Sequence, residues 1–98
     1  MLLKFVKSDG KVTKIRTKLE LTGAPVTIGR GSDADIQVDD GTCSRIHCAI
    51  RRWDDMYIIR DMDSSNGTKV NGEPVRVAEL LESDTVRIGG TEFSFEAE

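Results

Sequence analysis

Apolar and polar residues alternate over several short segments of this chain. Residues 19–21, 26–28, 86–88 and 92–96 each place an apolar side chain at every second position. A period of two turns one side of a segment toward a core and the other toward water, which is typical of β-strands. Turn-forming residues separate the segments, and no long helical period appears. The pattern predicts an all-β sandwich or barrel of many short strands.

Two hairpins can be placed within this pattern. Asn71-Gly72 lies between the short segments 68–70 and 73–75 and predicts a type I′ turn, because both central residues of that turn need positive φ. Pro74 follows and predicts that this hairpin lies at a sheet edge. Residues 46–52 and 56–62 are expected to form two central antiparallel strands joined by a turn at 53–55. Only residues 77–81 suggest a helix, of one turn at most.

Length and composition predict one ordinary soluble domain spanning residues 1–98. The chain has 98 residues, of which 38% are hydrophobic and 32% charged. A chain of this size can fold without disulfides or metal. No segment approaches the roughly 20 apolar residues of a membrane span, and residues 1–7 are too short and too rich in lysine for a signal peptide. We therefore expect a cytoplasmic protein with no membrane partner.

The charge balance argues against a nucleic-acid partner. Fourteen basic and 17 acidic residues give a net charge of −3, whereas a dedicated nucleic-acid binder needs a basic face. Residues 1–20 carry six basic and two acidic side chains, and residues 79–98 carry one basic and six acidic. This asymmetry is compatible with two interaction surfaces, but pairing of the two terminal strands is the favoured interpretation.

The cysteines predict neither a disulfide framework nor a metal site. Cys43 and Cys48 are the only two in the chain, and there is a single histidine. A zinc site would lack ligands unless carboxylates helped, so no metal or other cofactor is expected. On the strand predicted at 46–52, Cys48 and Ile50 are expected to point into the core, and both thiols are expected to be reduced.

Three short polar patches carry the candidate chemistry, each next to an apolar run of strand character. They supply two guanidinium groups, several hydroxyls, a carboxamide and backbone N–H groups made accessible by glycine, which together suit a dianion with several oxygens. The patches are Gly29-Arg30, Ser44-Arg45-Ile46-His47 and Ser64-Ser65-Asn66-Gly67-Thr68.

Each patch alone is weak evidence. Arg30 could clamp two phosphate oxygens, but it could equally pair with Asp33 or Asp35 as an exposed arginine. Ser65 and Asn66, followed by a glycine, more often mark a turn than a ligand site. Adjacent strand ends in a sandwich bring their loops together, so the three patches in this order predict one phosphate-binding site.

An enzymatic interpretation has less support. A thiol or serine hydrolase would use Cys43 or Ser44 as the nucleophile and His47 as the base, but no nucleophile-elbow sequence is present. A structural histidine that ties the loops together is favoured, with Asp61 as an acceptor that braces the third loop. A nucleotide site at residues 29–31 lacks a Walker lysine and a following helix.

The ordered series Gly29-Arg30, Ser44-x-x-His47 and Asn66-Gly67 resembles the forkhead-associated (FHA) domain family. Further matches support the resemblance, which covers about residues 24–95: Asp35-Ile36, Ile59-x-Asp61, Val70-Asn71-Gly72 and Leu80-x-x-x-Asp84-x-Val86-x-Ile88-Gly89.

This resemblance implies a sandwich of about 11 strands in two twisted, mainly antiparallel sheets, with binding loops at one end. It also implies a non-catalytic module that binds phosphothreonine in a partner protein, such as a Ser/Thr kinase or its substrate, during signalling. A phosphate-independent docking or scaffold domain of the same fold remains the alternative.

Residue roles follow from the same resemblance. The phosphopeptide would be bound by Arg30, Ser44, Arg45, Ser65 and Asn66. The loops would be shaped by Gly29, His47, Gly67 and Thr68. The small residues Gly41-Thr42 leave Arg45 as the only obvious cation that could select an acidic side chain near the phosphothreonine.

Overall fold

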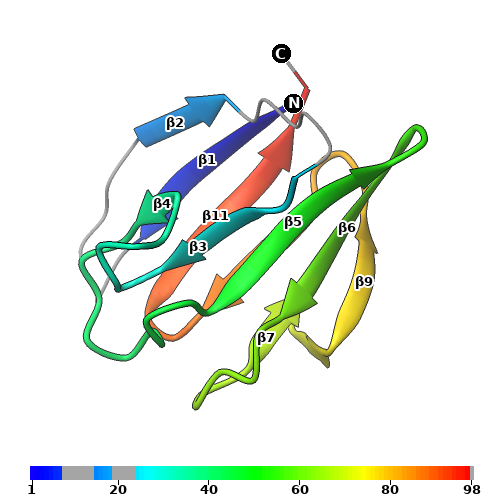
Figure 1. Cartoon of the computed structure of the whole chain (residues 1–98). Helices are drawn as coiled ribbons and strands as arrows, with labels where there is room; N and C mark the ends of the chain where they lie inside the picture. The colour runs from blue at the N-terminus through cyan, green and yellow to red at the C-terminus, as the bar shows by residue number, and fades with distance from the viewer. Residues whose placement is uncertain (8–14, 19–23, 98) are drawn as a thin grey trace.

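The chain forms eleven β-strands and no helix in the residues that the computed structural model describes, which are 1–7, 15–18 and 24–97 (Figure 1). None of these residues belongs to a helix that could cross a membrane. The segment expected to alternate at 19–21 lies outside the described residues. The strands are β1 (Leu2–Lys7), β2 (Ile15–Lys18), β3 (Val26–Gly29), β4 (Ile36–Gln37), β5 (Cys48–Trp53), β6 (Met56–Asp61), β7 (Thr68–Val70), β8 (Glu73–Val75), β9 (Val77–Leu80), β10 (Thr85–Ile88) and β11 (Thr91–Glu96).

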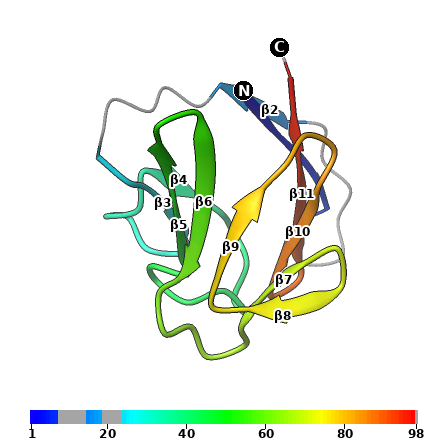
Figure 2. The ribbon, with the colours of Figure 1, turned by 90° about the vertical axis from the view of Figure 1, so that its right-hand side faces the viewer.

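The strands form two sheets that pack face to face. The six-stranded sheet has the order β2-β1-β11-β10-β7-β8, and the five-stranded sheet has the order β4-β3-β5-β6-β9. Figure 2 views the two layers edge on, with β5 and β6 in one layer and β10 and β11 in the other. All strand pairs are antiparallel except β3 with β4. The predicted β-sandwich of about 11 mainly antiparallel strands is confirmed.

Alternation along the strands produces the core between the sheets. On β11 the residues at 91, 93 and 95 are buried while those between them are only half-buried. Phe93 packs against Phe5 with ring centroids 5.0 Å apart. Cys48 and Ile50 are fully buried on β5, which confirms their predicted inward orientation. The buried apolar cluster comprises Leu3, Phe5, Ile28, Val38, Cys43, Cys48, Ile50, Ile59, Leu80, Val86, Ile88, Phe93 and Phe95.

The terminal strands pair with each other, as the charge asymmetry suggested. β1 lies antiparallel to β11, with Leu3 opposite Phe95 and Phe5 opposite Phe93. This pairing places the two ends of the described chain in the centre of the six-stranded sheet.

Both predicted hairpins are present. Asn71 and Gly72 have φ values of 51° and 83°, the positive values that a type I′ turn requires. They join β7 to β8, and β8, which contains Pro74, is the edge strand. The second hairpin joins β5 to β6, both of which lie inside the five-stranded sheet.

The suggested helical turn at 77–81 is wrong, because Val77–Leu80 is strand β9. This segment pairs antiparallel with β6, placing Ala78 opposite Ile59 and Leu80 opposite Tyr57. Ala78 and Leu80 are more buried than Val77 and Glu79. The short segment thus has a period of two, and an open sheet edge supplies the backbone partners that a single helical turn would lack.

Sheet register brings three chain segments to one end of the sandwich. Ile28 near the end of β3 is opposite Cys48 at the start of β5, which is opposite Asp61 at the end of β6. The loops that leave β3, enter β5 and leave β6 therefore lie together in Figure 1. These loops contain the three polar patches.

Candidate functional site

The first two polar patches are joined by backbone hydrogen bonds. The Arg30 N–H donates to the Ser44 carbonyl, and the Gly31 N–H donates to the Arg45 carbonyl, both at 2.9 Å. These bonds continue the pairing of β3 with β5 into the loops. The positions of Arg30 and Ser44 are therefore fixed relative to each other by the backbone.

Gly29 is required by the close approach of these two segments. A Cβ atom at this position would overlap the Arg45 carbonyl oxygen and would lie 2.9 Å from the Ser44 carbonyl oxygen. Both contacts are with backbone, which cannot move aside as a flexible side chain could. Gly29 thus allows the loop bearing Ser44 to lie directly against the end of β3.

Arg30 is exposed, and its guanidinium group is anchored on one side only. Its Nε donates to the Cys43 carbonyl at 3.1 Å. Among the described residues, the two terminal nitrogens of Arg30 have neither an ion pair nor a hydrogen bond, which leaves them available to an incoming anion. Arginine with two free terminal nitrogens can hold two phosphate oxygens at once.

The carboxylates that might have neutralised Arg30 have other partners. Asp33 lies 3.8 Å from the Arg45 guanidinium, with both side chains largely exposed. Asp35 accepts hydrogen bonds from the backbone N–H and the hydroxyl of Thr27 at 2.9 and 3.0 Å, and these bonds lower the pKa of Asp35. The alternative interpretation of Arg30, an ion pair with Asp33 or Asp35, is therefore not what the described residues show.

His47 connects the second patch to the third. It is completely buried, and its Nδ1 accepts a hydrogen bond from the Ser44 N–H at 3.1 Å. Its Nε2 lies 2.8 Å from the Gly67 carbonyl oxygen. A ring that accepts at Nδ1 and faces a carbonyl at Nε2 is neutral and carries its proton on Nε2. Both nitrogens are occupied, so His47 is a structural bridge with no free atom for general base chemistry.

Asp61 organises the third loop. Its carboxylate accepts from the Ser64 N–H at 3.1 Å, from the Ser64 hydroxyl at 2.5 Å and from the Thr68 hydroxyl at 2.7 Å. Burial raises the pKa of Asp61, but the hydrogen bonds from Ser64 and Thr68 outweigh it and the net shift is downward. The loop then turns at Gly67, which has a φ of 80° and donates its N–H to the Ser64 hydroxyl. Asp61 is therefore the loop-bracing acceptor that the sequence predicted.

Ser44, Ser65 and Asn66 meet where the second and third loops touch. The Ser65 N–H donates to the Ser44 hydroxyl oxygen at 3.0 Å, which leaves the Ser44 hydroxyl proton free to donate outward. The Asn66 Nδ2 donates to the Thr42 carbonyl at 2.7 Å, and its carboxamide oxygen has no protein partner among the described residues. The two loops thus form a hydrogen-bonded rim that consists of Thr42, Ser44, Ser65 and Asn66. Arg30 lies on the first loop.

Asp40, which the sequence did not single out, supports this rim together with Thr42. Asp40 is only 1% exposed, and it accepts from the Thr42 and Thr91 hydroxyls, both at 2.6 Å. Burial raises the pKa of Asp40, but its hydrogen bonds together lower it to about 2. The hydrogen bond between Asp40 and Thr42 could have been predicted from the sequence, because an Asp two residues before a Thr is the spacing of an Asx turn. The contact with Thr91, on a distant strand, has no local signal.

The cysteine thiols are poorly suited to catalysis. Cys43 is buried and donates its S–H to the Ile88 carbonyl at 3.2 Å. Burial, and then the negative charge of Asp40, raise the pKa of Cys43 to about 12. Burial also raises the pKa of Cys48. The two thiols are unpaired, and the described residues contain no cluster of three His, Cys, Asp or Glu side chains that could hold a metal.

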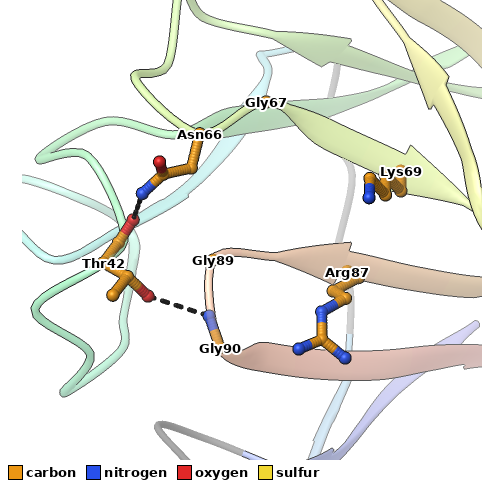
Figure 3. A pocket seen from close by; sticks show the side chains of 7 residues that line it. All are labelled: Thr42, Asn66, Gly67, Lys69, Arg87, Gly89 and Gly90. Atoms are coloured by element: carbon orange, nitrogen blue, oxygen red, sulfur yellow. Dashed lines mark hydrogen bonds between the residues drawn. The ribbon is translucent and has the colours of Figure 1, made fainter.

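An open pocket adjoins the rim on the side of the six-stranded sheet. It is lined by Thr42, Asn66, Gly67, Lys69, Arg87, Gly89 and Gly90. Figure 3 shows Asn66 and Thr42 on one side of this pocket and the cations Lys69 and Arg87 on the other. The Gly89-Gly90 turn is held to the rim by a 2.9 Å hydrogen bond from the Gly90 N–H to the Thr42 hydroxyl.

In a comparison with known protein families, residues 26–89 match the FHA domain. This range includes all three loops and most of the strands that position them. The resemblance inferred from the ordered motifs is confirmed.

Curated bacterial proteins share this part of the chain. The glycogen accumulation regulator GarA of Mycobacterium tuberculosis is 44% identical over 69 residues, which are 70% of this chain and 43% of GarA. The oxoglutarate dehydrogenase inhibitor of Corynebacterium jeikeium is 46% identical over 61 residues, 62% of this chain and 42% of the inhibitor. The FHA domain-containing protein FhaA of M. tuberculosis is 42% identical over 66 residues, 66% of this chain and 12% of FhaA. The chain thus matches less than half of the length of each relative.

Solved structures share the whole architecture. One, from a structural and functional study of phosphothreonine-dependent FHA domain interactions, has a TM-score of 0.84 and 30% identity, covering 100% of this chain and 98% of the other. The FHA domain of FhaA, complexed with the intracellular domain of Rv3910, has a TM-score of 0.80 and 32% identity, covering 94% of this chain and 97% of the other.

Proposed function

The chain belongs to the FHA domain family, and on this premise we propose that it is a non-catalytic module that binds phosphothreonine in a partner protein. It would act as an adaptor in Ser/Thr kinase signalling, with a kinase or a kinase substrate as its partner. The mechanism is reversible recognition of a dianionic phosphate on an extended segment of the partner.

The observation that carries this proposal is the Arg30 guanidinium beside the rim, which is held through its Nε and presents its two terminal nitrogens. Its terminal nitrogens have no carboxylate partner among the described residues, although Asp33 and Asp35 follow closely in sequence. The Ser44 hydroxyl, which already accepts from the Ser65 N–H, has a proton to donate. A cation and a hydroxyl donor on loops fixed by backbone bonds are preorganised for phosphate oxygens.

The other site residues have supporting roles in this proposal. Ser65 adds an exposed hydroxyl next to Ser44. Asn66 retains a free carboxamide oxygen and a second N–H, which match the donor and acceptor of a peptide backbone. Arg45 supplies a second exposed cation for the phosphate or the peptide. The loop-shaping residues Gly29, His47, Gly67 and Thr68 hold these groups in place.

The proposal also includes a non-catalytic role, a cytoplasmic location and a single domain. A thiol whose pKa is about 12 and a histidine with both nitrogens bonded support binding over hydrolysis. The relatives are named as regulators and inhibitors, and FhaA as an FHA domain-containing protein. We propose that residues 1–98 form one cytoplasmic binding domain that needs no cofactor.

A second candidate is phosphate-independent docking through the five-stranded sheet. Its outer face has a groove with apolar side chains, including Trp53, Ile58 and Met62. Trp53 is 56% exposed, and the Arg51 guanidinium lies over its ring at 5.1 Å from the centroid. Such a patch can mark an interaction surface, but it lies away from the phosphate-binding rim.

The test is binding of one peptide in three forms, followed by fluorescence anisotropy. We expect the phosphothreonine form to bind, and the phosphoserine and unphosphorylated forms to bind much more weakly or not at all. A degenerate phosphothreonine library supplies the first ligand and reads out the flanking preference. Equal binding of all three forms, or no binding by a folded sample, would favour phosphate-independent docking.

Arg30→Ala should reduce phosphopeptide affinity by about a hundredfold or more, because two charge-assisted hydrogen bonds are each worth about 1.5–3 kcal/mol. The matched control is Arg52→Ala, because Arg52 is also exposed and also donates its Nε to a backbone carbonyl, at 2.9 Å. Both variants should keep the wild-type melting temperature. Unfolding of Arg30→Ala alone would instead assign Arg30 a structural role.

A further inference from the structure

The outer face of the five-stranded sheet is apolar at positions where an exposed face is normally polar. On β6 the outward positions include Met56, Ile58 and Met62, while Ile59 among them points into the core and is fully buried. A strand that is apolar on both faces is typical of a sheet covered on both sides, whereas an exposed antiparallel sheet alternates apolar and polar positions. Met62 is 43% exposed and Trp53 of β5 is 56% exposed, so the described residues leave this face uncovered.

Two cations lie in the middle of the groove on this face. Arg51 on β5 and Arg60 on β6 line the groove, and neither forms an ion pair or a side-chain hydrogen bond among the described residues. No acidic side chain of the described residues lines the groove. Glu79 of β9 is opposite Ile58 beside the groove, but it has no ion pair with either arginine. The groove is therefore locally positive in a chain whose net charge is −3.

The register of β5 with β6 sets the spacing of charged and apolar positions along the groove. Arg51 is opposite Ile58, which is two residues from Arg60, so the two arginines are diagonal neighbours. Side chains in this relation are about 7–8 Å apart. Trp53 lies beyond the arginines at one end of the groove, and Met62 lies beyond them at the other. The order along the groove is therefore apolar, cationic, cationic, apolar.

The charges decide what kind of molecule fits the groove. In a two-fold dimer, a second copy of the chain would bring the same arginines toward each other, which is unfavourable. A nucleic acid or an anionic membrane is held by many cations, whereas the groove has two and the chain is acidic overall. A protein segment with both carboxylates and apolar side chains complements both features of the groove.

We infer that the groove binds an extended segment of a partner protein with the order apolar, acidic, acidic, apolar at alternate positions. Alternate residues of an extended segment are about 6.5–6.8 Å apart, close to the separation of the two arginines. The carboxylates meet Arg51 and Arg60, and the apolar side chains pack on Trp53 and Met62. None of the rim residues lines the groove. Binding there needs no phosphothreonine, so this inference does not depend on the proposed function.

The experiment uses Trp53 as its reporter, because it is the only tryptophan of the chain and lies in the groove. The peptide Leu-Thr-Glu-Thr-Glu-Thr-Leu with blocked ends is titrated into the millimolar range, and the controls replace both glutamates by glutamine or by lysine. We expect the glutamate peptide to shift the Trp53 emission to shorter wavelength, because the indole becomes buried. It should bind tighter than the glutamine peptide by up to about fivefold for each arginine, and the lysine peptide should bind most weakly. High salt should reduce these differences, because exposed charges are screened.

Variants assign the binding to its residues. Arg51→Gln and Arg60→Gln should each reduce the preference for glutamate over glutamine, and the double variant should abolish it. Arg52→Gln is the matched control, because Arg52 is also exposed on β5 but does not line the groove. Met62→Ser should weaken the binding of all three peptides, because it removes an apolar contact and leaves the Trp53 reporter in place. Thermal denaturation of each variant shows that the fold is retained.

Several results would overturn the inference. An unchanged Trp53 emission with every peptide, or equal binding of all three, would show that the groove does not select an acidic segment. Binding that persists in the double variant and disappears in Arg30→Ala would place the peptide at the phosphate-binding rim. An emission shift that depends on protein concentration, with a dimer in sedimentation equilibrium, would show that a second copy covers the groove. A shift caused by phosphatidylserine vesicles, and not by the peptides, would assign the groove to a membrane.

Discussion

Asp40→Asn should destabilise the protein more at neutral pH than in acid. The Asp40 carboxylate is 1% exposed and accepts from the Thr42 N–H at 2.9 Å and from the Thr42 and Thr91 hydroxyls, both at 2.6 Å. Burial raises its pKa, but these bonds outweigh burial and lower the pKa from 3.8 to about 2. Because one pKa unit corresponds to about 1.4 kcal/mol, the ionised carboxylate stabilises the fold by about 2 kcal/mol.

The direction of the pH dependence follows from the depressed pKa. The folded protein releases the Asp40 proton more easily than the unfolded chain does, so the stabilisation is fully present above the unfolded pKa of 3.8. It is lost as the pH falls from there toward 2. At pH 3 roughly half of it, about 1 kcal/mol, should remain. Asparagine cannot ionise, so the variant should lack this part of the pH dependence.

The assay is urea denaturation of both proteins at pH 7 and pH 3, followed by circular dichroism. We expect Asp40→Asn to be less stable by about 2 kcal/mol at pH 7 and by about 1 kcal/mol at pH 3. Other carboxylates with lowered pKa values, such as Asp61, are present in both proteins and cancel in the difference. Asp33→Asn is the control, since the Asp33 side chain is 60% exposed and removing its charge should change the free energy of unfolding little.

A difference between wild type and Asp40→Asn that is the same at both pH values would refute this reasoning. It would mean that the shape of the side chain, and not its charge, stabilises the contacts with Thr42 and Thr91. The acid stability of the wild type would then depend on other carboxylates.

Two further perturbations test the packing near the site. Gly29→Ala should cost about 1–3 kcal/mol and weaken phosphopeptide binding, because its Cβ would overlap the Arg45 carbonyl oxygen. Gly41→Ala, with nothing within 4 Å of the added Cβ, should be nearly neutral in urea denaturation, and equal effects would contradict the close-approach argument. Cys43 should react slowly with a thiol reagent at pH 8 in the folded protein, because it is buried and its pKa is raised to about 12; rapid modification without unfolding would show that the thiol is accessible.

Much of the fold could be predicted because its signals are local. Alternation at 26–28, 86–88 and 92–96 specified strands whose apolar faces form the core. Asn71-Gly72 specified its hairpin, because few residues tolerate positive φ at both central positions of the turn. The segment 77–81 was misjudged because four or five residues are too few to distinguish one helical turn from an edge strand.

The residues of the candidate site and the convergence of their loops could be predicted, but not which side chains within the site are paired. Gly29-Arg30, Ser44 and Asn66 stand out in order along the chain. Whether Arg30 is paired with a nearby aspartate, however, could not be predicted. Whether Arg30 is paired depends on where the Asp33 and Asp35 carboxylates point. Their direction depends in turn on their contacts with Arg45 and Thr27.

The sequence by itself therefore determined the strands, the turns and the chemical types in the loops, because backbone sterics and hydrophobic period act between near neighbours. Tertiary structure alone decided which groups meet. Asp40 reaches Thr91 across 51 positions of sequence, and Lys69 faces Arg87 because of the register of β7 with β10. Register is set by burial of whole strand faces, so the partners of a polar side chain follow from the assembled sheet and not from its neighbours along the chain.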